Sequence, residues 1–172
     1  MPAKSEPPIV RLRDVEADDL ALFFEHQRDP VAVAMVAFQS RDRAAFAQHW
    51  AKLLADDTLL KKTIVVAPSV SEDFPAQNQV AGHIGSWTSD GKRELGYWLD
   101  RAYWGRGIAT AAITAFLRLE PTRPLYAEVA KHNAASIRVL QKCGFTIAGV
   151  EDHPADGVNI PFVLLTLTTV AS

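Results

Sequence analysis

The chain has 172 residues, of which 48% are hydrophobic, and its formal net charge is -2 at pH 7. This length suffices for one sizeable core, and the apolar content is too high for a disordered protein. The slightly acidic balance argues against a nucleic-acid partner, because general nucleic-acid binders are usually basic.

The single cysteine, Cys143, excludes an intramolecular disulfide and fits a reducing compartment. No apolar run approaches the ~20 residues that span a bilayer, and the N-terminus lacks the apolar segment of a signal peptide. We therefore expect a cytoplasmic protein with no membrane partner. Residues 1–8 should form a flexible N-terminus, and residues 9–169 a single domain.

The first third of the chain predicts one strand, two helices and an irregular segment between them. Residues 9–13 form the strand, and Asp14 can cap a helix that runs to about residue 27. Residues 28–40 are apolar but irregular. Ser40 can cap the second helix, whose apolar face consists of Phe46, Trp50, Leu53 and Leu54.

Three strands follow. The β-branched residues at 63–67 predict a strand, and 68–78 is a loop rich in proline, serine and acidic residues. Strands at 79–87 and 93–100 flank the sequence Ser-Asp-Gly-Lys at 89–92, which is a strong β-hairpin signal.

Helices and strands alternate in the second half. A helix begins after Gly107 and ends before Pro121, because proline cannot continue a helix. Gly144 is the expected C-cap of a second helix. The remaining elements are a strand at 125–130, that second helix at 133–143, and strands at 145–151 and 160–168 around a turn at 154–157.

The expected order is therefore β-α-α-β-β-β-α-β-α-β-β. Strand–helix–strand alternation in the middle implies parallel pairing, whereas the two hairpins imply antiparallel pairing. We predict an α+β fold with a mixed sheet and helices on both faces.

Residues 95–110 carry the most informative motif. A strand feeds a loop that ends in Gly105-Arg106-Gly107, and a helix begins at once. Such a helix start binds phosphate through free N–H groups and its positive dipole end, and glycines allow close approach. Arg101 and Arg106 add cations. The P-loop lysine and the third Rossmann glycine are missing. The motif predicts a phosphate-bearing cofactor, against the alternative of a plain turn.

Two segments together resemble the GNAT superfamily of acetyl-CoA-dependent N-acetyltransferases. One is the glycine loop at 103–110, and the other is 133–145, with the sequence NAASIRVLQKCGF. The resemblance extends from residue 9 to about residue 167. Within the superfamily, the chain looks like the branch that contains the ribosomal-protein alanine N-acetyltransferases. The resemblance implies a GNAT-like fold: a central, mostly antiparallel seven-stranded sheet with a splayed parallel pair, flanked by four helices.

The resemblance also implies where acetyl-CoA, the co-substrate, would lie. The cleft would open where strand 94–99 separates from strand 125–130, with pantetheine on the backbone of the first strand and pyrophosphate on residues 104–110. Trp104 stands where the family usually has Gln or Arg, so main-chain N–H groups would make most phosphate contacts. The implied cofactor residues are Trp98, Leu99, Arg101, Trp104, Gly105, Arg106, Gly107, Ile108, Ala109, Thr110, Asn133, Ser136 and Lys142.

Acetyl transfer to an amine needs a base, a donor to the carbonyl oxygen and a proton for the leaving thiolate. Glu94 is the first candidate base, although it could instead be a solvated carboxylate paired with Lys92 or Arg93. His83 is a second candidate, against a structural, hydrogen-bonded role. A main-chain N–H group near Trp98 or Leu99 is the expected oxyanion donor.

The thiolate's proton is harder to assign, because Leu140 replaces a tyrosine that many family members use. Ser136 or water must serve. Asn133 should cap its helix and, by resemblance, lie near the pantetheine arm. Cys143 has no basic partner in the sequence and is interpreted as a core thiol. The histidines show no metal-ligand spacing, so no metal is expected.

These observations predict an enzyme that transfers an acetyl group from acetyl-CoA directly to a primary amine, either a protein N-terminus or a small molecule. The acceptor site should involve residues 28–43 and the turn 151–157, where acidic groups would favour a cationic amine unless they form a solvated turn. A non-catalytic acyl-CoA-binding or regulatory module and a nucleotide-binding protein are the alternatives. The protein should be a monomer or a homodimer.

Overall fold

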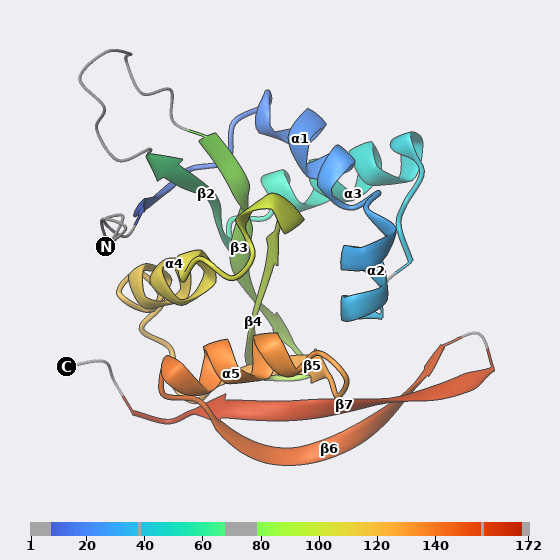
Figure 1. Ribbon diagram of the computed structural model, residues 1–172, viewed down its shortest axis with the longest axis vertical. Helices are drawn as coiled ribbons and strands as arrows, with labels where there is room; N and C mark the ends of the chain where they lie inside the picture. The colour runs from blue at the N-terminus through green and yellow to red at the C-terminus, as the bar shows by residue number, and fades with distance from the viewer. Residues whose placement is uncertain (1–7, 38, 68–78, 156, 170–172) are drawn as a thin grey trace, which may run out of the picture.

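The computed structural model describes residues 8–37, 39–67, 79–155 and 157–169. A seven-stranded sheet in the order β1-β2-β3-β4-β5-β7-β6 runs through the molecule (Figure 1). Its strands are β1 (Ile9–Arg13), β2 (Leu60–Ala67), β3 (Gln79–Ser89), β4 (Lys92–Leu99), β5 (Leu125–Ala130), β6 (Thr146–Ala155) and β7 (Val158–Leu167).

Helices cover both faces of this sheet, as predicted. On one side lie α1 (Asp19–His26), α2 (Pro30–Val36) and α3 (Arg43–Ala55), and on the other α4 (Ile108–Leu117) and α5 (Ala134–Lys142) (Figure 1). A short 3-10 turn, η1 (Arg101–Tyr103), connects β4 to the glycine loop. Among the described residues, no helix is both long and apolar enough to cross a bilayer.

The predicted hairpin between β3 and β4 is confirmed. Asp90 and Gly91 adopt φ angles of 48° and 76°. Two successive positive φ angles are characteristic of the tight turn that matches the twist of paired strands, and aspartate followed by glycine tolerates them well. The turn fixes the register in which Glu94 lies opposite Trp87.

The prediction of four helices is wrong by one, because α2 occupies the segment expected to be irregular. The Asp29 side chain accepts a hydrogen bond from the Val31 N–H at 3.0 Å, and Pro30 supplies the first helical residue. Ala37, at φ 50°, ends the helix. An aspartate cap followed by proline is a known helix start, but the helix is too short for a clear apolar period.

Two predicted caps are also wrong. Asp42, not Ser40, caps α3, since its side chain accepts a hydrogen bond from the Ala45 N–H at 2.8 Å. The first helix begins at Asp19 rather than after Asp14, whose carboxylate instead pairs with Lys62 on β2 at 2.5 Å. Side chains that can cap a helix are also suited to pairing with a neighbouring strand, and tertiary contacts decide between the two.

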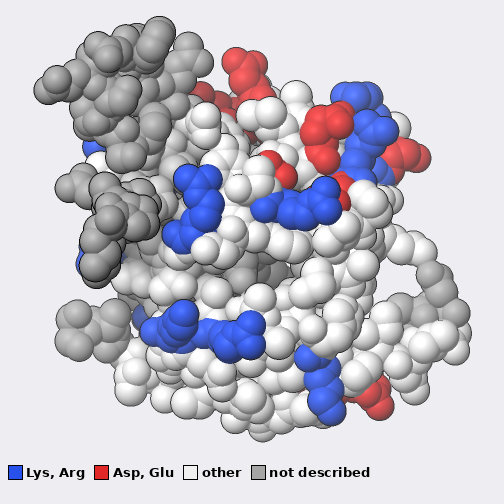
Figure 2. Space-filling view, in the orientation of Figure 1, with Lys and Arg blue, Asp and Glu red and all other residues white. Residues whose placement is uncertain are grey.

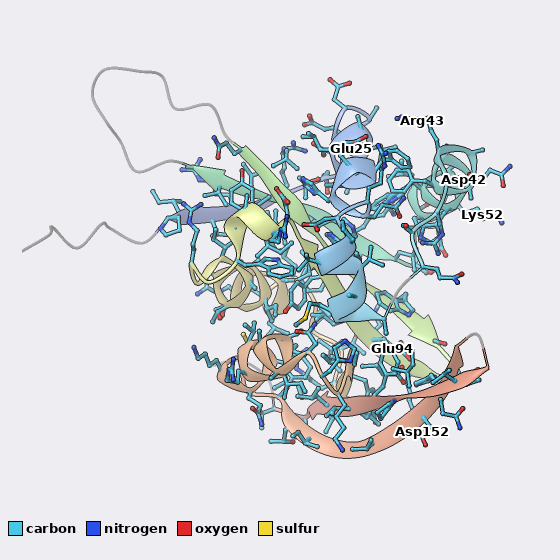
Figure 3. All side chains as sticks on the ribbon, turned by 45° about the vertical axis from the view of Figure 1, so that its right-hand side comes forward. Glu25, Asp42, Arg43, Lys52, Glu94 and Asp152 are labelled. Atoms are coloured by element: carbon cyan, nitrogen blue, oxygen red, sulfur yellow. The ribbon has the colours of Figure 1, made fainter. Side chains whose placement is uncertain are left out.

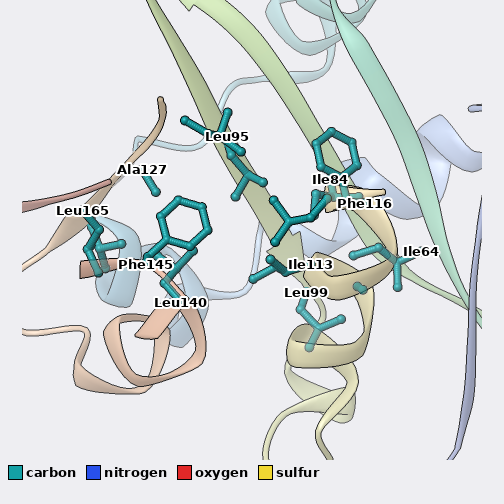
Figure 4. Close-up of a cluster of buried hydrophobic side chains, with 14 of the residues drawn as sticks. Ile64, Ile84, Leu95, Leu99, Ile113, Phe116, Ala127, Leu140, Phe145 and Leu165 are labelled. Carbon is teal, nitrogen blue, oxygen red and sulfur yellow. The ribbon is translucent and has the colours of Figure 1, made fainter. Parts of the chain in front are cut away.

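The main core lies between the sheet and the helices α4 and α5 (Figure 4). The α4 residues Ile108, Ala112 and Phe116 are buried there, each at most 1% exposed. A second, aromatic cluster of Phe23, Phe24, Phe46 and Trp50 fixes α1 and α3 to the other face. Both faces are therefore closed by apolar packing, which leaves the seam between β4 and β5 as the place for an opening.

The sheet is mixed and mostly antiparallel, with one parallel pair, as predicted. Strands β4 and β5 are that pair, and their register contains only Arg93 opposite Leu125 and Glu94 opposite Tyr126. Beyond these pairs β4 stays with β3, and β5 stays with β7. The sheet therefore splits into two parts along the remainder of β4.

Candidate active site

Two joined cavities occupy this split. A groove of about 370 Å³ lies along the end of β4, the glycine loop and α5, and a deeper cavity of about 210 Å³ reaches between β4 and β5. The side chains that line both are Val36, Tyr97, Trp98, Asn133 and Ser136. A ligand lying in the groove can thus extend into the deeper cavity past this junction.

The glycine loop forms one end of the groove. Gly105 and Gly107 have φ angles of 69° and 76°, and a Cβ atom at either would meet no heavy atom within 4 Å. Backbone conformation rather than lack of space therefore requires glycine here. Gly107 precedes the first residue of α4, and Ile108, Ala109 and Thr110 line the groove at the helix start. Free N–H groups of this first turn are suited to bind an anion.

Trp104 anchors this loop to β4. Its indole Nε1–H donates a hydrogen bond to the Leu99 carbonyl oxygen at 2.9 Å. The Tyr103 hydroxyl donates to Gln79 Oε1 at 3.0 Å and ties the loop to β3 as well. Trp104 and Leu99 both line the groove. The residue that departs from the usual family motif therefore has a positioning role.

The cations of the groove come from α5. Arg138 and Lys142, one helical turn apart, line it. Arg101 is paired with Asp29 at 2.9 Å, and the Arg106 guanidinium lies 5.7 Å from the Tyr103 ring centre. Neither of these two lines a cavity. Figure 2 shows Lys and Arg side chains over η1 and over α5, on both sides of a hollow.

Sequence reasoning did not select Arg138. Its spacing of four residues from Lys142 on an exposed helix face would have identified it, since residues four apart share a face. Asn133 caps α5 as predicted, because its side chain accepts a hydrogen bond from the Ser136 N–H at 3.2 Å.

The helix α2 closes the split from the other side of the sheet. Met35 and Val36 contribute to the cavity walls, within the segment expected to form the acceptor site. The Arg101–Asp29 pair holds the start of the helix, and His132 Nε2 lies 2.8 Å from the Ala34 carbonyl oxygen. The second bond connects α2 to the loop after β5. The predicted acceptor residues Phe38 and Asp156 lie outside the described residues.

A carboxylate that sequence reasoning did not select, Glu128 on β5, lines the deeper cavity. Glu94 does not line this cavity. It is half-buried and lies on the same face of the sheet as Glu128, between the helices and the β6–β7 hairpin that carries Asp152 (Figure 3). Burial raises the pKa of Glu94, the charge of Glu128 raises it further, and a hydrogen bond with Trp87 opposes both effects. Two interacting carboxylates next to a cavity are suited to accept a proton.

The structure places His83 away from both cavities, in the aromatic cluster. Its ring centre is 4.7 Å from that of Phe23 and 5.0 Å from that of Trp50. Burial, reinforced by the charges of His26 and His49, lowers the pKa of His83 to about 3. A ring in this position supports packing of α1 and α3 on the sheet, which is a structural role; the hydrogen bond expected of it stays a prediction.

The last hairpin, β6–β7, contributes one described side chain to the wall of the deeper cavity. Phe162 lines it, and the His153 ring packs edge-on against Phe162 at 4.9 Å. His153 Nε2 lies 3.2 Å from a carboxylate oxygen of Glu128. Ligand atoms of Glu128, Glu151 and His153 lie within 4.8 Å of one another, a spacing that could hold a metal ion. Sequence spacing could not show this group because its members come from two strands, and the absence of a metal remains a prediction.

Comparison with known proteins agrees with this architecture. Residues 10–146 match the family model of the acetyltransferase (GNAT) domain. The chain belongs to the GNAT acetyltransferase family. A search of curated proteins finds no match.

Solved GNAT structures share the fold at low sequence identity. Spermidine N-acetyltransferase from Vibrio cholerae, in complex with CoA and spermine, is 16% identical, with 92% of this chain and 95% of that one covered and a TM-score of 0.76. A GNAT-family acetyltransferase from Bacillus anthracis is 17% identical, with 96% of each chain covered and a TM-score of 0.74. Aminoglycoside acetyltransferase AAC(6')-Ib, in complex with coenzyme A, is 19% identical, with 93% and 95% covered and a TM-score of 0.71.

Proposed function

We propose that the protein is an acetyl-CoA-dependent N-acetyltransferase that transfers the acetyl group directly to a primary amine. The observation that carries this proposal is the continuity of the two cavities. One is lined by the glycine loop and by cations, the other by a carboxylate, and they meet between β4 and β5. Residues 9–169 would act as a single domain.

Acetyl-CoA would lie in the groove with its pyrophosphate on the start of α4. The N–H groups of residues 108–110 and the helix dipole favour an anion there, and Arg138 and Lys142 add positive charge along the same groove. The pantetheine arm, an extended amide chain, would pair with β4 backbone groups that have no partner on β5 beyond Glu94 among the described residues. The thioester would then reach the junction near Trp98.

The acceptor amine would enter the deeper cavity. Nucleophilic attack requires the neutral amine, so a carboxylate must remove a proton from the ammonium form. We propose that Glu94 and Glu128 share this task, since Glu128 faces the cavity and its charge raises the pKa of Glu94. The neutral amine of the acceptor would then attack the thioester carbon, and main-chain N–H groups near Trp98 would donate hydrogen bonds to the oxyanion.

The structural relatives act on different amines by their names, spermidine in one case and aminoglycosides in another. The resemblance to ribosomal-protein alanine N-acetyltransferases adds protein N-termini. A carboxylate in the acceptor cavity favours a cationic amine in each case. We propose a primary amine acceptor, a cytoplasmic location and a monomer or homodimer as the working state.

A CoA-release assay tests the proposal. Purified protein, acetyl-CoA and a panel of peptides with N-terminal Ala, Ser or Met, polyamines, aminoglycosides and amino acids should yield CoA with at least one amine. Acetyl-CoA should also raise the melting temperature more than ATP does. Thermal stabilisation without CoA release across the panel would favour the binding module, and stronger stabilisation by ATP would favour a nucleotide-binding protein.

A further inference from the structure

A pair of hydroxyl groups lies at the junction of the two cavities. The Tyr97 hydroxyl, on β4, is 2.8 Å from Ser136 Oγ, at the start of α5. Among the five side chains that line both cavities, only these two carry hydroxyls. A thioester that reaches from the groove to the deeper cavity must pass beside them.

The surroundings of the pair hold it in place. The Tyr97 ring packs against the main core, and the Ser136 N–H is fixed to the Asn133 side chain at 3.2 Å. A tyrosine hydroxyl can accept one hydrogen bond while donating another. When Ser136 donates to the Tyr97 oxygen, the tyrosine proton is free to point into the junction.

The phenol also has the proton that the reaction needs. Burial raises the pKa of Tyr97, although the hydrogen bond with Ser136 opposes this effect. Tyr97 therefore remains protonated at neutral pH. Leu140, one turn beyond Ser136 on the same cavity wall, has no proton to give.

We propose that Tyr97 is the catalytic proton donor to the leaving sulfur atom, and that Ser136 is a positioning residue that orients the Tyr97 hydroxyl. This inference rests on the proposed acetyl transfer. The amine nitrogen bonds to the thioester carbon, and the C–S bond breaks with its electron pair passing to sulfur. The Tyr97 proton moves to that sulfur, which gives the free thiol of CoA. The phenolate regains a proton from solvent through Ser136, and the carboxylates release to solvent the proton that they took from the amine, so that one proton is lost and one is gained in each turnover.

The variant Tyr97→Phe tests the inference because it keeps the ring and removes the hydroxyl. We expect kcat to fall on the order of 100-fold, while the KM for acetyl-CoA and the melting temperature stay close to those of the wild type. Tyr126→Phe is the matched control, since Tyr126 lies on the neighbouring strand and lines neither cavity. It should keep wild-type kcat.

Ser136→Ala separates the two hydroxyls, and also decides the matter if Tyr97→Phe fails to fold. A positioning role predicts a smaller fall in kcat than the loss of Tyr97 causes, and no further fall when both changes are combined. A kcat for Tyr97→Phe within about twofold of the wild type would overturn the inference, as would complete loss of turnover in Ser136→Ala alone. Wild-type turnover in the same assay keeps this result distinct from a failure of the proposed function, in which the wild type itself would release no CoA.

Discussion

The groove and the deeper cavity are built in opposite ways. The glycine loop and the helix start that form one end of the groove come from residues 103–110, a single continuous stretch. The deeper cavity draws Val36, Glu128, Leu140 and Phe162 from four separate elements. A site for a widely used cofactor can be encoded locally, whereas a site for a particular acceptor depends on how distant elements are placed. Substitutions should therefore affect binding in the first region and turnover in the second.

The largest effect is expected from Gly107→Glu. A side chain at φ 76° strains the backbone by roughly 1–2 kcal/mol, and the new carboxylate would lie at the proposed phosphate site. Isothermal titration should detect no acetyl-CoA binding. Gly91→Glu is the control, because Gly91 has the same φ of 76° and equally open space but lies in the β3–β4 turn. Unchanged acetyl-CoA affinity in Gly107→Glu would show that the pyrophosphate does not bind at this loop.

The stability of the short paired stretch of β4 and β5, which joins the two parts of the sheet, should depend strongly on Glu120. This buried carboxylate accepts hydrogen bonds from Ser86 at 2.5 Å and from Arg93 at 2.8 Å, where β4 still pairs with β5. Glu120→Gln should lower the free energy of unfolding by roughly 2 kcal/mol, because the partly buried Arg93 guanidinium loses its carboxylate partner and keeps only its hydrogen bonds to the Thr58 carbonyl and Thr88 hydroxyl oxygens. Urea titrations at pH 7 measure this, with the exposed Asp57→Asn as control. A loss no larger than that of the control would contradict it.

The same carboxylate predicts an acid dependence of stability. Hydrogen bonds from Ser86, Thr122 and Arg93 outweigh the opposing effect of burial and lower the pKa of Glu120 from 4.5 to about 2. A depressed folded-state pKa adds stability above the ordinary value, and this stability is lost as pH falls from about 4.5 towards about 2. The difference between wild type and Glu120→Gln should therefore shrink over that range. A difference that stays constant would assign the effect to packing.

Glu128→Gln should reduce turnover without changing acetyl-CoA affinity, which separates the two regions directly. We expect kcat/KM for the amine to fall about 100-fold if Glu128 takes part in proton removal. Because the charge of Glu128 raises the pKa of Glu94, the acidic limb of the pH–rate profile should also move to lower pH. Glu94→Gln provides the comparison. A full wild-type profile in both variants would mean that neither carboxylate is the base.

The smallest effect is expected from Arg138→Ala. An exposed cation facing a phosphate contributes little, so acetyl-CoA affinity should weaken by about two- to fivefold at low salt and by less as salt is added. Arg118→Ala is the control, because Arg118 is an exposed cation at the end of α4 that does not line the groove. Equal effects in both variants would indicate a general electrostatic attraction between the protein's positive charges and the phosphates, rather than a local contact of Arg138.

The sequence predicted most of the fold because its signals are local. The bounds of β5 and the turn before β4 follow from short patterns, and the start of α4 follows from Gly107. The helix α2 is too short for a visible period, so only the Asp29-Pro30 pair marks it. The position at which β4 and β5 separate was predicted from the family resemblance and not from any residue pattern.

The candidate site was less predictable for a physical reason. Glu128 alternates with core residues along β5, whereas Tyr97 shares the face of the core residues Leu95 and Leu99. A strand pattern does not tell which residue of either face forms the wall of a cavity. Arg101 has a suitable charge near the loop, but Asp29, far from it in sequence, pairs with it. Side chains near a motif in sequence can therefore have other partners, and side chains far from it can complete the site.

The two-residue register between β4 and β5 also has a mechanical meaning. Two pairs of residues, with the few side chains around them, hold one half of the sheet beside the other. An extended amide ligand lying beyond those pairs would continue the hydrogen-bonded ladder between the two parts of the sheet. The free energy of ligand binding would then also stabilise the association of the two parts of the sheet. Amide hydrogens along β5 should therefore exchange more slowly when the ligand is present.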